Sequence, residues 1–144
     1  MCIRYGKLSN KDCLDLINLW NRAKLPSKPN GRDTLQNLAK QLELKRNLFL
    51  GAFHNDNLIG VVIATHNGRK GWINRLAIDP EFRKQGIASI LIKQCEEFFL
   101  KADVQVFACL IENWNQKSEN LFEKSGYTKY KDVSYFTKRI NPEV

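Results

Sequence analysis
The stretch NRLAIDPEFRKQGIAS, residues 74 to 89, decides the fold, because in it a strand pattern runs through a short basic loop into a helix pattern. The first turn of a helix carries unpaired N–H groups and about half a positive charge. Gly86 and Ala88 are small enough to let a ligand approach that backbone, and Arg83 and Lys84 add positive side chains. The pattern predicts that a diphosphate binds here. The alternative is that Gly86 only eases a loop into a helix and that the basic residues are solvated.

Three strand patterns lie around this stretch, at residues 48–53, 58–65 and 72–78. Their connections, HNDN (54–57) and HNGRKG (66–71), are typical of hairpins, so we expect an antiparallel meander. Residues 58–64 are almost all apolar, which predicts a central strand that is covered on both faces.

Helical patterns precede and follow the meander. Two apolar stripes predict front helices, the first after a capping box of Ser9 and Asp12 and the second after Asp33 or Thr34. These stripes are Leu14, Ile17 and Trp20, then Leu35, Leu38 and Leu42. A third helix is expected to begin near Lys84 and to place one apolar face on the sheet. That face consists of Ile87, Leu91, Cys95 and Phe98.

The rest of the chain alternates between strand and helix patterns. We expect a strand at 104–111, a helix at 116–124 with Leu121 and Phe122 inward, Gly126 as its stop, and a final β segment at 127–140. Strand, helix and strand in close order predict that the sheet becomes partly parallel, between the strands at 72–78 and 104–111.

Composition limits the class of protein. With 144 residues, 43% hydrophobic and 26% charged, the chain is expected to form a single domain over residues 1–144. A net charge of +8 favours an anionic partner. The polar N-terminus and the lack of a run of about 18 apolar residues predict a cytoplasmic protein without a membrane partner.

The cysteines are scattered at positions 2, 13, 95 and 109, without the spacing of a metal site. We therefore expect no metal. Cys13, Cys95 and Cys109 lie among apolar neighbours and are interpreted as core thiols rather than nucleophiles.

A second motif, NQKSENLFEKSGY at residues 115–127, follows the predicted strand at 104–111. With the first motif, it makes the chain resemble the GNAT superfamily of N-acetyltransferases over nearly its whole length. Arg83, Gly86 and Ala88 match the family's Q/R-x-x-G-x-G/A signature. The second signature is matched by Asn115, Leu121, Phe122, Glu123, Lys124, Gly126 and Tyr127, with Ser118 where alanine is usual.

The resemblance implies the α/β (α+β) GNAT fold, with a mixed sheet of about seven strands and four flanking helices. It also implies acetyl-CoA as cofactor, with the pantetheine arm paired to backbone of the 72–78 strand and the diphosphate on the loop before the third helix. Transfer to an amine would be direct, without an acetyl-enzyme. The expected cofactor residues are Leu76, Ala77, Ile78, Arg83, Lys84, Gln85, Gly86, Ile87, Ala88, Ser89, Asn115 and Phe122.

Two departures from the family concern catalysis. Phe122 stands where many members have the tyrosine that protonates the leaving thiolate, and residues 71–78 contain no carboxylate base. Glu112 is the nearest acidic candidate for the base, and Tyr127 or Tyr135 for a substitute phenol. The alternatives are a solvated Glu112 and packing roles for both tyrosines. A low-pKa amine would also suffice, because deprotonation at pH 7 costs about 1 to 1.4 kcal/mol for an α-amine against roughly 4.6 for a lysine-like amine.

The acceptor is expected to be a primary amine of a small molecule or of a peptide or protein N-terminus. Arg32, Asp33, Trp72 and Arg75 are candidates for binding it, or they are surface residues. The first rival function is an acetyl-CoA-binding sensor or scaffold with little catalysis. Nucleic-acid binding is disfavoured, since the basic residues are dispersed and no reader motif occurs. A homodimer is compatible with a fold of this kind.

Overall fold
The computed structural model describes residues 2–144 and contains one mixed sheet in which spatial order follows chain order, β1-β2-β3-β4-β5. Its strands are β1 (Arg4–Lys7), β2 (Asn47–His54), β3 (Asn57–His66), β4 (Gly71–Ile78) and β5 (Phe107–Ala108). Its helices are η1 (Asn10–Asp12), α1 (Cys13–Arg22), α2 (Leu35–Leu42), η2 (Pro80–Phe82), α3 (Ile87–Lys101) and α4 (Gln116–Lys124), where η marks a 3₁₀ helix. The mixed α/β fold with four α-helices is confirmed.

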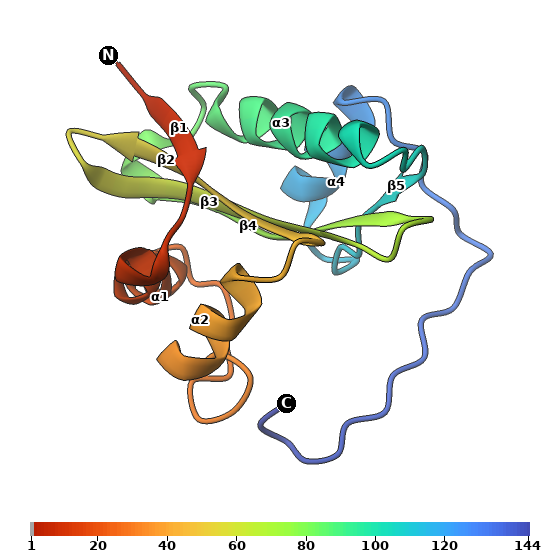
Figure 1. Cartoon of the computed structure of the whole chain (residues 1–144). Coiled ribbons are helices and arrows are strands. Elements are labelled where there is room, and N and C mark those ends of the chain that lie inside the picture. Colours follow the sequence, from red (N-terminus) through yellow and green to blue (C-terminus); the bar gives the residue numbers. More distant parts are fainter. Residues whose placement is uncertain (1) are drawn as a thin grey trace.

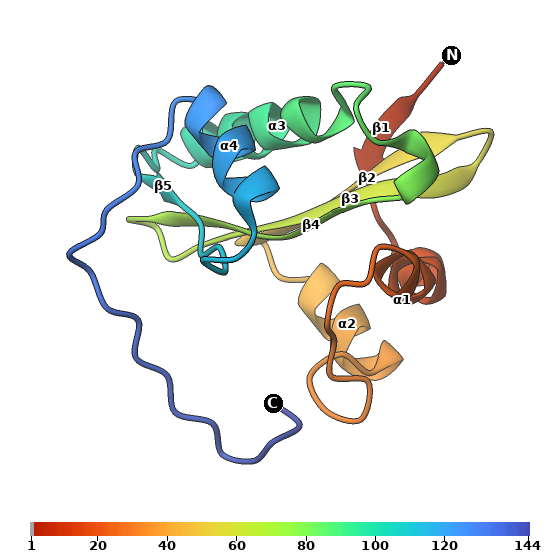
Figure 2. The same cartoon turned by 180° about the vertical axis from the view of Figure 1, so that it is seen from behind.

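The helices form a layer on each side of the sheet. Helices α1 and α2 cover one face, and α3 and α4 cover the other (Figures 1 and 2). Each layer closes its own apolar core, one around Trp20 and Phe49 and one around Leu91 and Phe99. Strand β3 lies between the layers with residues 58–64 all buried, as the continuous apolar run predicted.

The predicted meander is confirmed, and its first turn shows why. Strands β2 and β3 are joined by Asn55 and Asp56, whose φ angles of 50° and 65° give the left-handed pair that a two-residue hairpin of this twist requires. Asparagine and aspartate tolerate this conformation better than most residues. Strands β3 and β4 pair antiparallel, and among residues 2–144 β4 and β5 form the one parallel pair.

A β-bulge in β4 changes which face its side chains reach. On β3, Val61 and Ile63 lie opposite Ala77 and Asn74, so β4 carries one extra residue, and Arg75 there has a φ of 54°. Before the bulge Ile73 packs on the α3 side of the sheet. After it, Ala77 packs on the α1 side, while Leu76 and Ile78 join the α3 side.

The predicted helices all form, but with differences in face and start. Leu14 and Leu35 are exposed, because the buried face of α1 consists of Cys13, Leu16, Leu19 and Trp20, and that of α2 of Leu38 and Leu42. Helix α3 begins at Ile87 rather than near Lys84, since Lys84 and Gly86 have left-handed backbone angles that no helix continues through. Phe99 rather than Phe98 is the fully buried residue at its end. Helix α4 has the predicted bounds.

The strands differ from the prediction in three places, and among residues 2–144 the sheet has five strands rather than about seven. The N-terminal strand β1 was not predicted, because an edge strand needs no continuous apolar pattern. Only Phe107–Ala108 of the predicted strand at 104–111 pairs with β4. The prediction of a strand at 127–140 is wrong: Tyr127 packs against the α3-side core, and residues 128–140 run past the sheet edge as an extended, exposed segment (Figure 1). Within residues 2–144 no helix has the length and apolar character to cross a bilayer.

Candidate functional site
The start of α3 combines several features of an anion-binding backbone. Lys84 and Gly86 have φ angles of 65° and 81°, so the chain turns sharply into the helix. Gly86 is the N-cap, no side chain accepts from the first-turn N–H groups, and that turn contains no acidic residue. The amides of Ile87, Ala88 and Ser89 are therefore available to a ligand.

The starts of two other helices, α2 and α4, are capped by side chains. The Thr34 hydroxyl accepts from the Asn37 N–H at 3.1 Å at the start of α2, and Asn115 Oδ1 accepts from the Ser118 N–H at 3.2 Å at the start of α4. The uncapped start of α3, a helix of 15 residues, thus contrasts with both. An anion placed there would satisfy donors that a capping side chain satisfies elsewhere.

The space beside Gly86 is open. A Cβ atom built on Gly86 meets no protein atom within 4 Å, and residues 83–86 are exposed. The surroundings therefore fit a diphosphate in contact with main chain, and the charges of Arg83 and Lys84 suit it.

The outer edge of β4 leads to this helix start. Strand β4 pairs with β5 only at Gly71 and Trp72, so residues 73–78 have no partner on that edge among residues 2–144. At the end of β4 the Arg83 Nε donates to the Ile78 carbonyl at 3.2 Å. A strand edge presents N–H and C=O groups that an extended amide-containing ligand can pair with.

Most of the predicted cofactor residues lie together, but Ala77, Asn115 and Phe122 do not lie with them. Leu76, Ile78 and residues 83–89 lie together along the β4 edge and the start of α3, whereas Ala77 is buried on the opposite face. Asn115 uses its side chain to cap α4. Phe122 is buried in the α3-side core, edge-on to the Tyr127 ring with centroids 5.1 Å apart. Its role beside a cofactor stays a prediction.

The three catalytic candidates differ in burial and in hydrogen bonding. The Tyr127 hydroxyl donates to Glu96 Oε2 at 2.6 Å, and burial, followed by this bond, raises the pKa of Tyr127. A phenol held protonated in this way is a poor proton donor, which favours the packing alternative. Glu112 is exposed, and Tyr135 is 66% exposed on the C-terminal segment. Catalytic roles for these two residues stay predictions.

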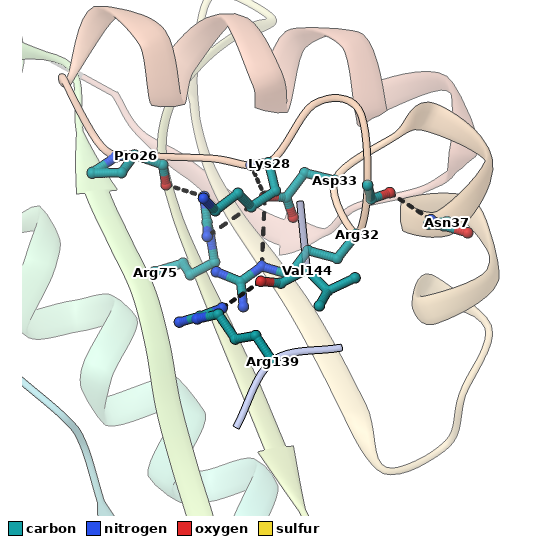
Figure 3. Close-up of polar contacts among 9 residues, drawn as sticks. Pro26, Lys28, Arg32, Asp33, Asn37, Arg75, Arg139 and Val144 are labelled. Atoms are coloured by element: carbon teal, nitrogen blue, oxygen red, sulfur yellow. Dashed lines mark hydrogen bonds and ion pairs between the residues drawn. The ribbon is translucent and has the colours of Figure 1, made fainter. Parts of the chain in front are cut away.

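Two acceptor candidates, Asp33 and Arg75, pair with each other. Arg75 Nη1 lies 3.7 Å from Asp33 Oδ2, and Nη2 donates to the Pro26 carbonyl at 2.8 Å (Figure 3). The same guanidinium stacks at 4.0 Å over the ring of Trp20, and Asp33 accepts from the Lys28 N–H at 2.6 Å. The pair thereby joins the loop between α1 and α2 to the bulge of β4.

This connection is what the sequence analysis missed. Trp20, Asp33 and Arg75 are widely separated in the chain, and each has an ordinary local context. The stretch PSKPNG (26–31) is rich in turn residues and thus typical of a loop, but no local pattern indicates what holds that loop in place.

The remaining acceptor candidates are more open. Arg32 is half-exposed and contributes to a shallow hollow of about 640 Å³ between α2 and Val144. Its lining also includes Asn30, Gly31, Thr34, Gln36, Asn37, Lys40, Gln41 and Val144. Trp72 is half-buried, with the Lys70 ammonium 4.6 Å from its ring centroid. These positions leave Arg32 and Trp72 able to contact a ligand.

Burial makes three of the four thiols poor nucleophiles. It raises the pKa of Cys95 to about 12 and of Cys109 to about 11, and it also raises the pKa of Cys13. Cys2 is exposed. Since the thiolate is the reactive form, the three raised values disfavour an acetyl-enzyme on these residues.

We therefore expect one fast thiol per chain with a thiol-reactive dye at pH 8, at Cys2, and three slow ones. At that pH a thiol with a pKa of about 11 is only about 0.1% thiolate. Under denaturing conditions all four thiols should react at similar rates. Two or more fast thiols in the folded protein would contradict the assignment of Cys13, Cys95 and Cys109 to the core.

Comparison with known proteins finds both a family and related folds. The model of the acetyltransferase (GNAT) family matches residues 13–127. The PaiA N-acetyltransferase of Thermoplasma acidophilum, solved with coenzyme A, superposes with a TM-score of 0.82 at 22% identity, covering 93% of this chain and 94% of that one. An aminoglycoside 6'-N-acetyltransferase from Acinetobacter baumannii gives 0.79 at 21%, covering 97% and 100%.

Proposed function
Because the chain belongs to the acetyltransferase (GNAT) family, we propose that it is an acetyl-CoA-dependent N-acetyltransferase acting on a primary amine of a small molecule or of a peptide or protein N-terminus. The observation that carries this proposal is the uncapped start of α3 beside the unpaired edge of β4. Solved structures of similar fold contain coenzyme A or a bisubstrate analogue of it, which supports the proposal.

The residues around Gly86 would hold the diphosphate of the cofactor. The amides of Ile87, Ala88 and Ser89 would donate to it, and Arg83, Lys84 and Gln85 would surround it from the exposed loop. Backbone at Leu76 and Ile78 would pair with the pantetheine arm along β4. When bound, acetyl-CoA supplies the acetyl thioester that the amine attacks.

The acceptor would approach from the side of the α1–α2 loop. Arg75 and Asp33 fix this loop to the β4 bulge, so the loop already has its shape before the acceptor binds. Relatives of similar fold include aminoglycoside acetyltransferases. A chain of net charge +8 repels polycations at long range, which favours an amine on a neutral or acidic molecule.

Positioning would carry much of the catalysis. Strand β4 offers no carboxylate, and Phe122 offers no phenol. Correct placement of two reactants alone supplies large rate factors. An amine of low pKa needs only a weak base, so an α-amino group suits this site better than a lysine side chain.

The proposal is tested by binding and turnover of acetyl-CoA. At 100 times its dissociation constant, a ligand stabilises the folded state by about 2.7 kcal/mol, which should raise Tm by roughly 5–10 °C for this size. Release of free thiol should then depend on an added amine from a panel of amino acids, peptides, polyamines and aminoglycosides. No shift in Tm would refute the proposed function. A shift without amine-dependent thiol release would favour the rival, an acetyl-CoA sensor or scaffold.

With an active acceptor in hand, the predicted base is tested by Glu112→Gln. If Glu112 accepts the proton, the variant should lose about 10²- to 10⁴-fold in kcat/KM and the acidic limb of its pH profile. Glu97→Gln, which changes an exposed carboxylate on α3 outside both motifs, is the control and should leave both unchanged. An unchanged profile for Glu112→Gln would show that the residue is solvated surface.

A further inference from the structure
Arg22, the last residue of α1, binds the segment that leads from β4 into the proposed diphosphate site. Helix α1 covers one face of the sheet and α3 covers the other (Figures 1 and 2). The Arg22 Nε donates to Asp79 Oδ2 at 2.9 Å, and its Nη2 donates to the Leu58 carbonyl at 3.1 Å. Asp79 directly follows β4, and Leu58 is the second residue of β3. One side chain of α1 thus joins the end of β4 to the start of β3.

The Asp79 carboxylate also shapes the turn before α3. Its Oδ1 accepts from the Glu81 N–H at 3.0 Å and so caps η2. The Asp79 carbonyl accepts from the Phe82 N–H at 2.8 Å, and the Asp79 N–H donates to the Ile59 carbonyl at 2.8 Å. The two oxygens of one carboxylate therefore connect Arg22 on α1 with η2.

The loop of residues 83–86, which follows η2, needs support from its flanks. Lys84 has a left-handed φ of 65°, which costs free energy in a residue with a Cβ atom. All four residues are exposed, so burial of their side chains does not fix the loop. A conformation of this kind persists only where the neighbouring structure determines it. Phe82 packs against the α3-side core, and Arg22 holds Asp79 from the α1 side.

Arg22 also balances a negative charge next to the proposed site. The Asp79 side chain is only 13% exposed, and it lies a few residues before the loop that would bind the diphosphate. A partly buried carboxylate repels an anion more strongly than one that water screens fully. Removal of Arg22 would therefore both loosen the turn and leave this charge without its partner.

We propose that Arg22 is a positioning residue for acetyl-CoA, an inference that rests on the proposed function. Arg22 acts through Asp79 on the loop before α3 and does not itself touch the cofactor. Hydrogen-bonded networks between packed elements can carry such an effect from one face of a sheet to the other. The α1–α2 loop begins just after Arg22. The helix that leads into the proposed acceptor loop therefore also sets the affinity for the cofactor.

The first test uses the protein without any ligand. In Arg22→Met the amides of Glu81 and Phe82 should exchange in deuterated water at least about 10-fold faster than in the wild type, because their bonds to Asp79 open more often. NMR spectra give the exchange rate of each amide.

Lys129→Met is the matched control. The Lys129 ammonium lies 2.9 Å from the Glu119 carboxylate, with side-chain exposures of 49% and 9%. The pair of Arg22 and Asp79 has the same distance and exposures of 45% and 13%. Both variants thus remove the exposed cation of a similar ion pair, and only Arg22→Met should change exchange before α3.

The second test measures affinity for coenzyme A by calorimetry. Arg22→Met should raise the dissociation constant about 3- to 30-fold, while Lys129→Met leaves it unchanged. Arg22→Lys should recover part of the loss, because an ammonium can still pair with Asp79. Pantetheine lacks the diphosphate, so NMR titration should show equal affinity for it in the wild type and in Arg22→Met. A general loss of structure would instead weaken both ligands.

A double variant separates position from charge. Asp79→Asn added to Arg22→Met removes the unpaired charge, and the affinity should stay within about 3-fold of that of Arg22→Met. A return to the wild-type affinity would show that Arg22 only neutralises the carboxylate, which overturns the positioning role.

Two further results would overturn this role. They are unchanged amide exchange at Glu81 and Phe82 in Arg22→Met, and equal affinities of Arg22→Met and the wild type for coenzyme A. Either result leaves the proposed function standing, since the wild type still binds coenzyme A. A wild-type protein that binds no coenzyme A refutes the proposed function and this inference with it.

Discussion
Replacing Gly86 by alanine is expected to weaken acetyl-CoA binding by about 10- to 100-fold. Gly86 has a φ of 81°, and a Cβ there meets no protein atom within 4 Å, so the added methyl group clashes with nothing in the protein itself. It would stand where the diphosphate is proposed to approach the amides of α3. Loss of one hydrogen bond to a charged group costs about 1.5–3 kcal/mol, which corresponds to this range. Calorimetric titration with acetyl-CoA gives the affinity directly.

Gly126→Ala is the matched control for this experiment. Gly126 has a φ of 97°, its Cβ position is equally open, and it ends α4 rather than beginning α3. Both variants place alanine in a left-handed conformation and should lose about 1–2 kcal/mol of stability. Only Gly86→Ala should lose affinity. Equal affinities for the two variants would refute a diphosphate site at Gly86, whatever their stabilities.

The largest expected loss of stability is for Arg75→Met, about 2–4 kcal/mol. The Arg75 side chain is 18% exposed and its partner Asp33 is 7% exposed, so removal of the guanidinium leaves a buried carboxylate without its main counter-charge. The variant also loses the bond to the Pro26 carbonyl and the stacking on Trp20. Asp33 still accepts a hydrogen bond from the Lys28 N–H. The loss of stability should therefore lie in the lower part of the range that is usual for breaking a buried ion pair. Urea unfolding measures it.

Two further variants test how much of this loss comes from the ion pair between Arg75 and Asp33. Arg32→Met removes a half-exposed arginine whose Nε lies 4.0 Å from the same Asp33 carboxylate, and it should cost less than about 1 kcal/mol. Adding Asp33→Asn to Arg75→Met should recover part of the loss, since the unpaired charge disappears. If Arg75→Met and Arg32→Met cost the same, the interpretation of Arg75 as the anchor of the α1–α2 loop is wrong.

Much of the fold was predictable from the sequence because its signals are local. The alternation of strands β2 to β4, the left-handed pair Asn55 and Asp56, and the helix at 116–124 each depend on residues within one turn or hairpin. The same holds for the first motif. Whether a glycine and a short basic loop begin a helix is decided by neighbours along the chain, so Gly86 could be singled out without coordinates.

Other features needed the tertiary structure. Leu14 and Leu16 both suit a helix stripe, and only the position of α1 against the sheet exposes one and buries the other. Residues 127–140 have good strand composition, yet a strand exists only where a partner edge lies beside it, and this chain leads the segment elsewhere. The paired state of Asp33 and Arg75 likewise depends on closing a long loop.

The amino-acid sequence by itself thus determined the order and type of most elements, the family resemblance and the prediction of a diphosphate site at the start of α3. The tertiary structure decided which faces are buried, where β4 bulges, that Tyr127 donates to Glu96, and that residues 127–140 pair with no strand among residues 2–144. The physical reason is the distance along the chain between the residues that interact. Turn geometry and helix capping are set by neighbouring residues, whereas burial, ion pairs and strand partners are set by residues that meet only after the chain has folded.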